Sequence, residues 1–393
     1  MSEIVSAWGD NSNGNLGNGT EDARNAPSPI DGLDGVRTIE SGSGHVIAVL
    51  DDGTAYAWGR NAFGQVGNAS TDNATTPQQV RLDGIAAVAP GGGHTLFLRT
   101  DGTLWGCGAG FFGMLGAKSM GVHPVPVPIE APEGIVSLVS GGSHALALLE
   151  DGTVWTWGRD DRGQLGDGDE AGNRPGHLVQ SHAGVEFTVR NTPAPVAGLT
   201  DATFVAAGGG HSLVVHADGT LSGWGFNDCG QLGDGTNDNT NRPARLPVEG
   251  VRSVAGAYHH TLALLEDGTV RAFGLNDCGQ LGNGETTTTS SPVEVKGLRN
   301  VREIAATGGG GDTSPGNFGH SLAVLDDGTL WAWGCNNSGE LGLGSNEGRI
   351  VPVQVPGLSG VRHVTAGGDI PFARENPGGG SAAAIHRTEG AKP

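Results

Sequence analysis

Short apolar stretches alternate with turn-forming residues along the whole chain. In residues 251–274, an apolar stretch ends in a glycine turn, His260 opens a second stretch, and Asp267-Gly268 leads into a third. A glycine-rich loop follows, and then a fourth stretch such as residues 291–298. Asp-Gly between two apolar stretches predicts a hairpin, so the unit predicts four antiparallel strands. No segment carries a convincing 3.6-residue period of a helix.

This unit occurs seven times. An aromatic-Gly or Cys-Gly dipeptide marks each copy, and successive copies lie 49 to 67 residues apart. The dipeptides begin at Trp8, Trp58, Cys107, Trp157, Trp224, Phe273 and Trp333. A period near 50 residues is typical of arrays and propellers. Seven units of four strands predict an all-β, seven-bladed β-propeller, in which closure of the ring hides the strand edges.

The predicted blades form one domain over residues 1–393. They span about 36–82, 85–130, 135–197, 202–248, 251–295, 301–355, and finally 361–390 together with 3–30. In this last blade, residues 361–390 give the two inner strands and residues 3–30 the two outer ones. We therefore expect the N-terminal strand to close the ring.

The residues that recur in every unit predict structural roles. A histidine opens the second stretch at His45, His94, His144, His211, His260 and His320, and Ala382 takes this place in the seventh copy. Equivalent positions around a ring cannot converge on one ion, so we expect each imidazole to bond backbone groups of its own glycine turn. The tryptophans alternate with small residues and predict packing between blades. The pattern indicates neither a metal site nor a cofactor.

The loop after each marker dipeptide has the form x-Asn-x-x-Gly-Gln-Leu-Gly, and we call it the clasp. It is residues 226–233 in the fourth unit. Its glycines permit positive φ, and its asparagine can bond local backbone. No Lys-Ser/Thr and no helix follow it, as a phosphate loop would require. The clasp therefore predicts a structural part, and function must lie where the repeats differ.

The composition of the chain limits the kinds of partner that the protein could bind. The net charge is −20 with three lysines, so the surface should repel nucleic acid and anionic membranes, whereas a basic patch on a protein partner would suit it. The chain has no apolar segment of about 18 residues and no secretory signal pattern, which favours a cytoplasmic protein. The four cysteines lie in four different units and are expected to be reduced thiols.

Together, the Gly-Gly-x-His turn, the Asp-Gly-Thr hairpin, the Trp-Gly dipeptide and the Gly-Gln-Leu-Gly loop resemble the regulator of chromosome condensation repeat family. The resemblance covers nearly the whole chain and implies a seven-bladed propeller. The family includes a nucleotide exchange factor, a UV-B photoreceptor, ubiquitin-ligase propellers and secreted β-lactamase inhibitors. This chain has neither the basic N-terminal tail of the exchange factor nor the tryptophans beside the photoreceptor's repeat histidines. High glycine and few lysines are typical of a bacterial member.

The units differ mainly in connections that should share one face. These are residues 167–196, 308–320 and 367–381. The clasp of the second blade also lacks the repeat's Asn and Gln. Exposed aromatic residues on one face are typical of a contact surface. The predicted partner-binding residues are Phe63, Phe111, Phe112, Met114 and Phe372.

Three functions fit this pattern. The first is a protein-interaction propeller that binds a partner through this face. The second is an enzyme with a small-molecule site at the channel mouth, although no nucleophile–base or metal spacing is visible. Its acid–base residues would be His177, His182, Asp312, Asp369, Arg374 and Glu375. The third is an inhibitor of a secreted enzyme such as a β-lactamase.

Overall fold

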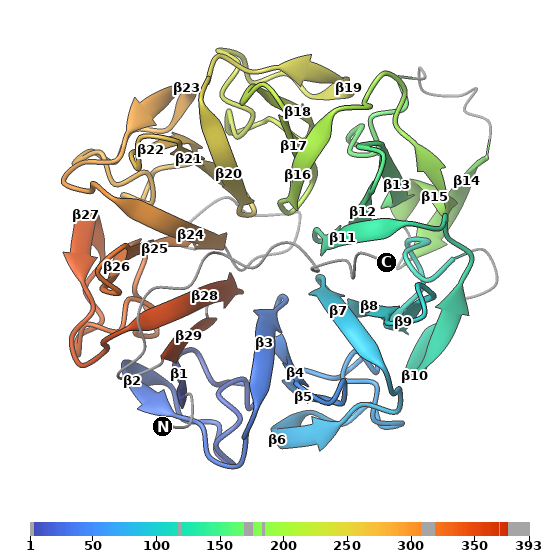
Figure 1. The fold of residues 1–393 in the computed structure, drawn as a ribbon, viewed down its shortest axis with the longest axis horizontal. Helices are drawn as coiled ribbons and strands as arrows, with labels where there is room; N and C mark the ends of the chain where they lie inside the picture. Colours follow the sequence, from blue (N-terminus) through green and yellow to red (C-terminus); the bar gives the residue numbers. More distant parts are fainter. Residues whose placement is uncertain are drawn as a thin grey trace, which may run out of the picture.

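Seven antiparallel sheets are arranged in a ring around a central axis in the computed structural model (Figure 1). It describes residues 4–116, 120–168, 176–182, 185–307, 319–368 and 370–375. Within these ranges every regular element is a strand, and no helix is long and apolar enough to cross a membrane. The prediction of an all-β, seven-bladed propeller is confirmed.

The first strand of each blade lies innermost and the fourth outermost (Figure 1). Blade 1 comprises β3 (Val36–Ser41), β4 (His45–Leu50), β5 (Ala55–Gly59) and β6 (Ala74–Gln79). Blade 2 comprises β7 (Ile85–Pro90), β8 (His94–Arg99), β9 (Leu104–Ala109) and β10 (Val122–Ile129). Blade 3 comprises β11 (Ile135–Ser140), β12 (His144–Leu149), β13 (Val154–Arg159), β15 (Val185–Pro195) and an additional strand, β14 (His177–His182).

The remaining blades have four strands each. Blade 4 comprises β16 (Ala202–Ala207), β17 (His211–His216), β18 (Leu221–Gly225) and β19 (Thr240–Arg245). Blade 5 comprises β20 (Val251–Gly256), β21 (His260–Leu265), β22 (Val270–Gly274) and β23 (Thr289–Glu294). Blade 6 comprises β24 (Val301–Thr307), β25 (His320–Leu325), β26 (Leu330–Gly334) and β27 (Arg349–Gln354). Blade 7 comprises β28 (Val361–Gly367), β29 (Ile370–Glu375), β1 (Ile4–Gly9) and β2 (Arg24–Pro29).

Blade 7 joins the two ends of the chain. β1 lies between β29 and β2, and Ala7 pairs with Phe372, as expected for closure by the N-terminal strand. The prediction for its second strand was wrong. Residues 370–375 are not part of an inserted loop but form β29 directly after Gly367-Gly368, so Ile370, not Ala382, takes the histidine's place. The apolar Ile370 and Phe372 are both buried there, which explains why this segment forms a core strand.

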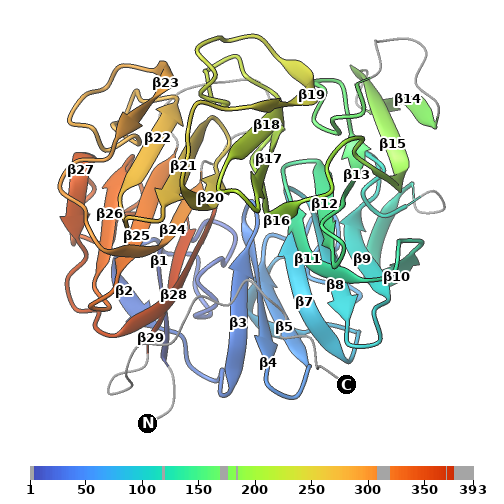
Figure 2. The same ribbon diagram turned by 45° about the horizontal axis from the view of Figure 1, so that its top comes forward.

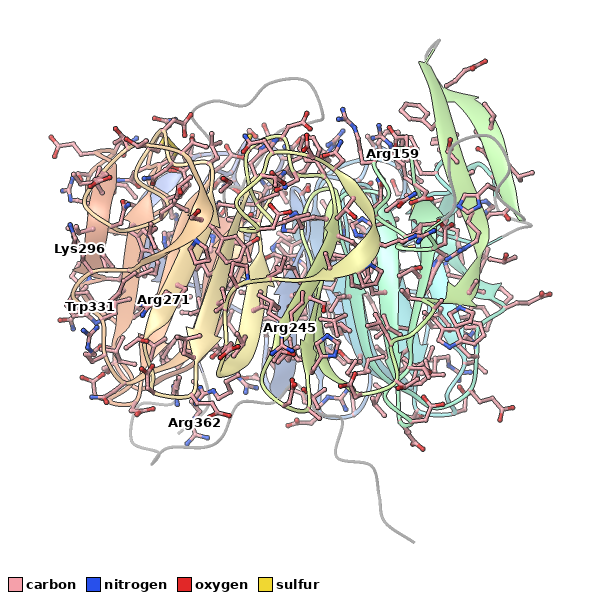
Figure 3. The ribbon with its side chains drawn as sticks, turned by 90° about the horizontal axis from the view of Figure 1, so that it is seen from above. Arg159, Arg245, Arg271, Lys296, Trp331 and Arg362 are labelled. Atoms are coloured by element: carbon pink, nitrogen blue, oxygen red, sulfur yellow. A yellow bond between two sulfur atoms is a disulfide. The ribbon has the colours of Figure 1, made fainter. Side chains whose placement is uncertain are left out.

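The two faces of the ring differ. One carries the short Asp-Gly hairpins, in which an aspartate such as Asp267 accepts bonds from both the backbone N–H and the hydroxyl of Thr269. The other, the clasp face, carries the glycine turns, the clasps and the β14–β15 hairpin. In Figure 3 this hairpin rises on the side where Arg159 lies, while Arg245 and Arg362 lie toward the opposite side. Figure 2 shows β14 at the outer edge of blade 3.

The glycine turns touch one another around the channel mouth. Gly92 N donates to Gly142 O, Gly142 N to Gly209 O, and Gly209 N to Ala257 O, each at 3.1 Å. A Cβ atom added to Gly92 would lie 2.4 Å from Gly142 O. Glycine recurs here because adjacent turns approach within hydrogen-bonding distance and leave no room for a side chain.

Five of the six recurring histidines bond to the neighbouring blade, which corrects the expectation that each bonds its own turn. His144 Nε2 lies 3.0 Å from Ser212 Oγ of the next blade, and that hydroxyl donates to Gln164 O at 2.8 Å. Because the hydroxyl's hydrogen goes to the carbonyl, Nε2 must be the donor to Ser212. Trp224 Nε1 donates to the same carbonyl at 2.9 Å. Histidine, hydroxyl, clasp carbonyl and tryptophan thus form one joint between two blades.

The joint recurs with variations. Thr95, Thr261 and Ser321 supply the hydroxyl in three other joints. Where Cys107 replaces tryptophan, its Sγ lies 3.4 Å from Gln65 O and makes the equivalent bond. The five tryptophans of the Trp-Gly dipeptides are fully buried, as expected for packing between blades.

The expectation of four reduced thiols was wrong. Cys278, in the clasp of blade 5, and Cys335, after the Trp-Gly of blade 6, form a disulfide. Both lie on the clasp face, where these two positions of adjacent blades meet. Cys107 and Cys229 are free.

Candidate functional site

A cavity of about 340 Å³ opens at the channel mouth on the clasp face. Blades 7, 1, 2 and 3 supply most of its wall, and Tyr258 reaches it from blade 5. Its side chains include Asp10, Asn15, Arg60, Phe63, Phe111, Phe112, Met114 and Tyr258. This mixture of apolar surface and a few polar groups is typical of a binding pocket.

The cavity lies where two clasps depart from the repeat. In blade 1, Gln65 Oε1 accepts a bond from Phe63 N at 3.0 Å, and the other Gln clasps do the same. Blade 7 has the shorter Asn15 at this position, and its buried Oδ1 has no hydrogen-bond partner. Blade 2 has Met114. The altered clasps therefore flank the regular clasp of blade 1 and shape the pocket beside it.

Four of the five predicted partner-binding residues line this pocket, and three of them, Phe63, Phe111 and Phe112, are partly exposed. Phe63 and Phe111 meet edge to face with ring centroids 6.2 Å apart. Phe112 packs instead against Phe187 of β15, at 5.1 Å, so the insertion of blade 3 partly covers it. These contacts hold the rings in fixed positions at the pocket wall.

The other two predicted partner-binding residues are buried and cannot be exposed anchors. Met114 is 1% exposed, and its carbonyl accepts the bond from Trp157 Nε1. Phe372 is 0% exposed because it lies on β29, where it packs edge to face against Trp58. Sequence reasoning treated both as loop residues, but strand and clasp packing turns them inward.

The candidate acid–base residues whose side chains the structure describes, His177, Arg374 and Glu375, do not come together. Arg374 and Glu375 lie at the end of β29, away from the clasp face. Arg374 donates to Val36 O at 2.9 Å, and the buried Glu375 carboxylate accepts bonds from Ser6 Oγ and Ser359 N. Asp312 and Asp369 lie outside the described residues, as does most of 308–320 and 376–381. His182 ends β14 at the hairpin tip, and its side chain is not described.

His177 lies in a cluster of side chains whose opposite charges balance one another. Its Nε2 lies 3.0 Å from Asp160 Oδ2 and 3.0 Å from Asp167 Oδ2. Burial alone would lower the pKa of His177, but hydrogen bonds and charge from the two aspartates outweigh it and raise the pKa to about 9. Asp160 stands where other clasps have asparagine, and protonated His177 supplies the donor that the amide would provide.

These three residues could also offer one ligand atom each to a metal ion. However, Arg190 Nη1 lies 3.4 Å from Asp167 Oδ2 and adds a second positive charge. Two carboxylates, an imidazolium and a guanidinium already balance one another. The cluster therefore fits an internal ion-pair network that anchors the β14–β15 hairpin to its blade.

Blade 4 contains a Ser-His-Asp arrangement that the sequence did not reveal. His216 Nδ1 lies 2.8 Å from Asp201 Oδ1, and its Nε2 lies 2.8 Å from Ser222 Oγ. These atoms match the roles in a hydrolytic triad. Yet Ser222 is 7% exposed within β18, whereas the Asp201 side chain is 54% exposed. A hidden nucleophile and a solvated carboxylate fit a structural hydrogen-bond network better than catalysis.

Comparisons with known proteins agree with the fold and the repeats. Residues 5–373 match the family model for the RCC1-like domain. The chain is 30% identical over 161 residues to the mouse E3 ubiquitin-protein ligase HERC2, covering 40% of this chain and 3% of HERC2. It is also 30% identical over 164 residues to the Arabidopsis thaliana ultraviolet-B receptor UVR8, covering 40% of this chain and 35% of UVR8. The chain thus spans only a minor part of these relatives.

Solved structures show the same architecture. Yeast RCC1 (Prp20), solved bound to Kap60, superposes with a TM-score of 0.80 at 20% identity, over 95% of this chain and 89% of that one. Human WBSCR16 gives a TM-score of 0.79 at 22% identity, over 95% and 99%. With the family match over nearly its whole length and the seven-bladed ring that the family implies, the chain belongs to the RCC1-like domain family.

Proposed function

We propose that this protein is a non-catalytic interaction propeller that binds a protein partner through the clasp face of blades 7, 1, 2 and 3. The observation that carries the proposal is the pocket at the channel mouth, which lies where the repeat departs from its pattern. Clasp residues that elsewhere bond their own loop are replaced there by Asn15 and Met114. Departures from a structural repeat are expected at the surface that serves a function.

The β14–β15 hairpin extends this surface. On β14, Leu178 is 48% and Val179 is 70% exposed, and Met120 and Val122 of blade 2 are also exposed. Gln180 Nε2 lies 3.4 Å from Met120 Sδ, which links the two blades. Exposed apolar side chains gathered beside a pocket are typical of a protein contact surface.

The family supports a protein partner in general terms. Yeast RCC1 (Prp20) has been solved bound to Kap60, and its binding to Gsp1p and histones has been described. HERC2 and UVR8 are a ubiquitin ligase and a light receptor, so the family includes several regulatory proteins. At these identities no partner carries over to this chain. Its net charge of −20 favours a partner with basic surface outside the pocket.

The test is face-dependent capture from a lysate of the source organism. Phe111→Ser and the pair Leu178→Ser/Val179→Ser should each weaken capture of the same partner by about tenfold or more, because buried aromatic and apolar anchors dominate binding energy. Asp218→Asn with Asp267→Asn alters the hairpins of the opposite face and should leave capture unchanged. Loss of capture from the hairpin variants alone would place the working surface on the other face.

A further inference from the structure

Two arginines occupy equivalent positions on the clasp face but differ in their surroundings. Arg60 and Arg159 each follow the Trp-Gly of their blade. Arg159 Nε lies 2.5 Å from Asp161 Oδ1, and its Nη2 lies 2.8 Å from Asp161 Oδ2. Its guanidinium also lies over the ring of Phe187, 4.5 Å from the centroid. In this blade the position thus combines an arginine, a bidentate carboxylate and an aromatic ring.

Arg60 has the aromatic ring but not the carboxylate. Its guanidinium lies over Phe63 at 5.7 Å, which corresponds to the stacking of Arg159. The residue two positions later is Ala62 instead of an aspartate. No carboxylate of the described residues forms an ion pair with Arg60, although Arg60 lines the pocket. Blade 3 therefore shows that this arginine position can bind a carboxylate, and the described residues supply none to Arg60 at the pocket.

Solvent can satisfy Arg60 while the face is open, as it does for most surface arginines. A partner that docks over the pocket changes this, because it removes the water and leaves a charge that is costly to bury alone. The nearby Asp10 does not fill the role. Its carboxylate accepts bonds from Ser12 Oγ at 2.9 Å and Asn15 Nδ2 at 3.0 Å.

Asn15 does not fill the role either. Its Nδ2 is fixed on Asp10, and its Oδ1 is buried without a hydrogen-bond partner, out of reach of a molecule in the pocket. A carboxylate on the partner would supply what Arg60 lacks.

We propose that the pocket receives the side chain of an aspartate or glutamate from the protein partner, with the carboxylate on Arg60. This inference rests on the proposed function, since it names the residue that the partner inserts. Phe63 and Phe111 pack against the methylene groups of that side chain. The acidic residue therefore acts locally, within a partner surface that need not be acidic elsewhere.

The probe is N-acetyl-glutamate N-methylamide, and N-acetyl-glutamine N-methylamide is its uncharged match. Binding is followed by NMR on the side-chain Nε–Hε signal of Arg60, which is assigned from its loss in Arg60→Gln. The glutamate probe should shift this signal in a saturable way, and the glutamine probe should shift it at least about fivefold less at equal concentration. Equal shifts with both probes, or no shift with either, would overturn the inference.

Ala62→Asp gives the sharper test, because it rebuilds within the chain the carboxylate that Arg159 has. Ala62 is exposed, and Asp161, Asp228 and Asp277 hold the same clasp position in other blades, so the fold should tolerate the change. Ala62→Asp should abolish the response to the glutamate probe, whereas Ala62→Asn should preserve it, as blade 6 has Asn337 there. An unchanged response in Ala62→Asp would refute the assignment to Arg60.

The same variants separate this inference from the proposed function. If Phe111→Ser abolishes partner capture while Arg60→Gln and Ala62→Asp leave it unchanged, the partner binds this face without an acidic residue on Arg60. The function would then stand and the inference would fail. If none of the clasp-face variants affects capture, the proposed function itself fails.

Discussion

Two successive joints of the ring differ in how many of the repeat's hydrogen bonds they contain. One lies between blades 5 and 6, and the other between blades 6 and 7. In the first, His260 Nε2 lies 2.9 Å from Ser321 Oγ, which donates to Gln280 O at 2.9 Å. Trp333 Nε1 donates to that carbonyl as well, and the Cys278–Cys335 disulfide crosses the same joint. Every polar contact of the repeat is present, and a covalent bond is added.

The second joint keeps only the tryptophan. Trp8 Nε1 donates to Glu340 O at 2.8 Å. His320 is buried, and neither of its ring nitrogens has a hydrogen-bond partner, because Pro371 stands where Ser321 stands in blade 6. On the other side of blade 7, Ile370 replaces the histidine altogether. The blade that joins the chain ends thus has no histidine–hydroxyl contact on either side.

This difference separates two functions of the repeat. The tryptophan-to-clasp bond occurs at both joints, whereas the histidine–hydroxyl contact occurs only at the first. The histidine–hydroxyl contact adds stability but restricts the residues on the inner turn. Blade 7 lacks that restriction and supplies Asp10 and Asn15 to the pocket. The pocket therefore lies beside a blade that has no histidine–hydroxyl contact among its described residues.

Acid should disrupt the joints that depend on histidine, and this is the largest effect we predict. Burial lowers the pKa of five of these histidines to about 3 and that of His144 to about 4. The unfolded chain binds protons near pH 6.5 and the folded one does not, so stability falls as pH drops below 6.5. Each such histidine lowers the free energy of unfolding by about 1.4 kcal/mol for every pH unit below 6.5. Urea unfolding at pH 7 and pH 5 should show a loss of several kcal/mol, and equal stability at both would contradict the burial of neutral imidazoles.

The pKa values of two other histidines are shifted in the opposite direction, above the usual value. Burial lowers the pKa of His363, but the charge of Glu303 and hydrogen bonds to Glu303 and Glu40 outweigh it and raise the pKa to about 10. His177 behaves alike, with a pKa of about 9. Their contribution is complete below pH 6.5 and is lost as the pH rises through 9 to 10. His363→Gln should flatten the alkaline side of the stability profile and leave the acid side unchanged.

Deleting residues 1–9 should have the next largest effect, because it removes β1 from the blade with the fewest joint contacts. Val5 and Trp8 are buried, and the deletion exposes the edges of β29 and β2. Loss of this apolar burial should lower the free energy of unfolding by about 5 kcal/mol or more. Ile4→Ser, at a position 37% exposed, should change it by less than about 0.5 kcal/mol. A truncated protein with unchanged stability would show that β1 does not close the ring.

The sequence predicted the fold because each blade repeats the same turn and strand signals. The periodic Asp-Gly and Trp-Gly dipeptides located the strands, and the match between the two chain ends located the closure. Sequence reasoning placed the second strand of blade 7 too late in the chain, because the glycine-rich residues 376–381 resemble a repeat turn as closely as Gly367-Gly368 does. Phe63, Phe111 and Phe112 were predicted for this face, whereas Arg60 and Asn15, which line the same pocket, were not. The special feature of Arg60 becomes visible only when equivalent positions of different blades, such as Ala62 and Asp161, are compared.

Removing the disulfide should weaken the joint between blades 5 and 6 by an intermediate amount. The bridge links residues 57 apart, and closing a loop of that length stabilises the folded state by about 4 kcal/mol in the chain-entropy treatment. Cys278→Ser with Cys335→Ser should lower the denaturation midpoint accordingly, and reductant should then have no further effect. Cys229→Ser is the matched control, since Cys229 is a free thiol at the equivalent position of blade 4. An unchanged midpoint in the double variant would mean that the blades hold together equally well without the bridge.

The smallest predicted effect is the difference in stability between a variant without His260 and a variant without His320. His260→Ala removes packing and a hydrogen bond to Ser321, whereas His320→Ala removes packing alone. Because both side chains are almost fully buried, the packing costs should be similar, and His260→Ala should be more destabilising by about 1 kcal/mol. A double-mutant cycle of His260→Ala with Ser321→Ala should give a coupling energy of the same size. Equal costs for the two histidines and no coupling would mean that burial, and not the hydroxyl contact, explains why histidine recurs at this position.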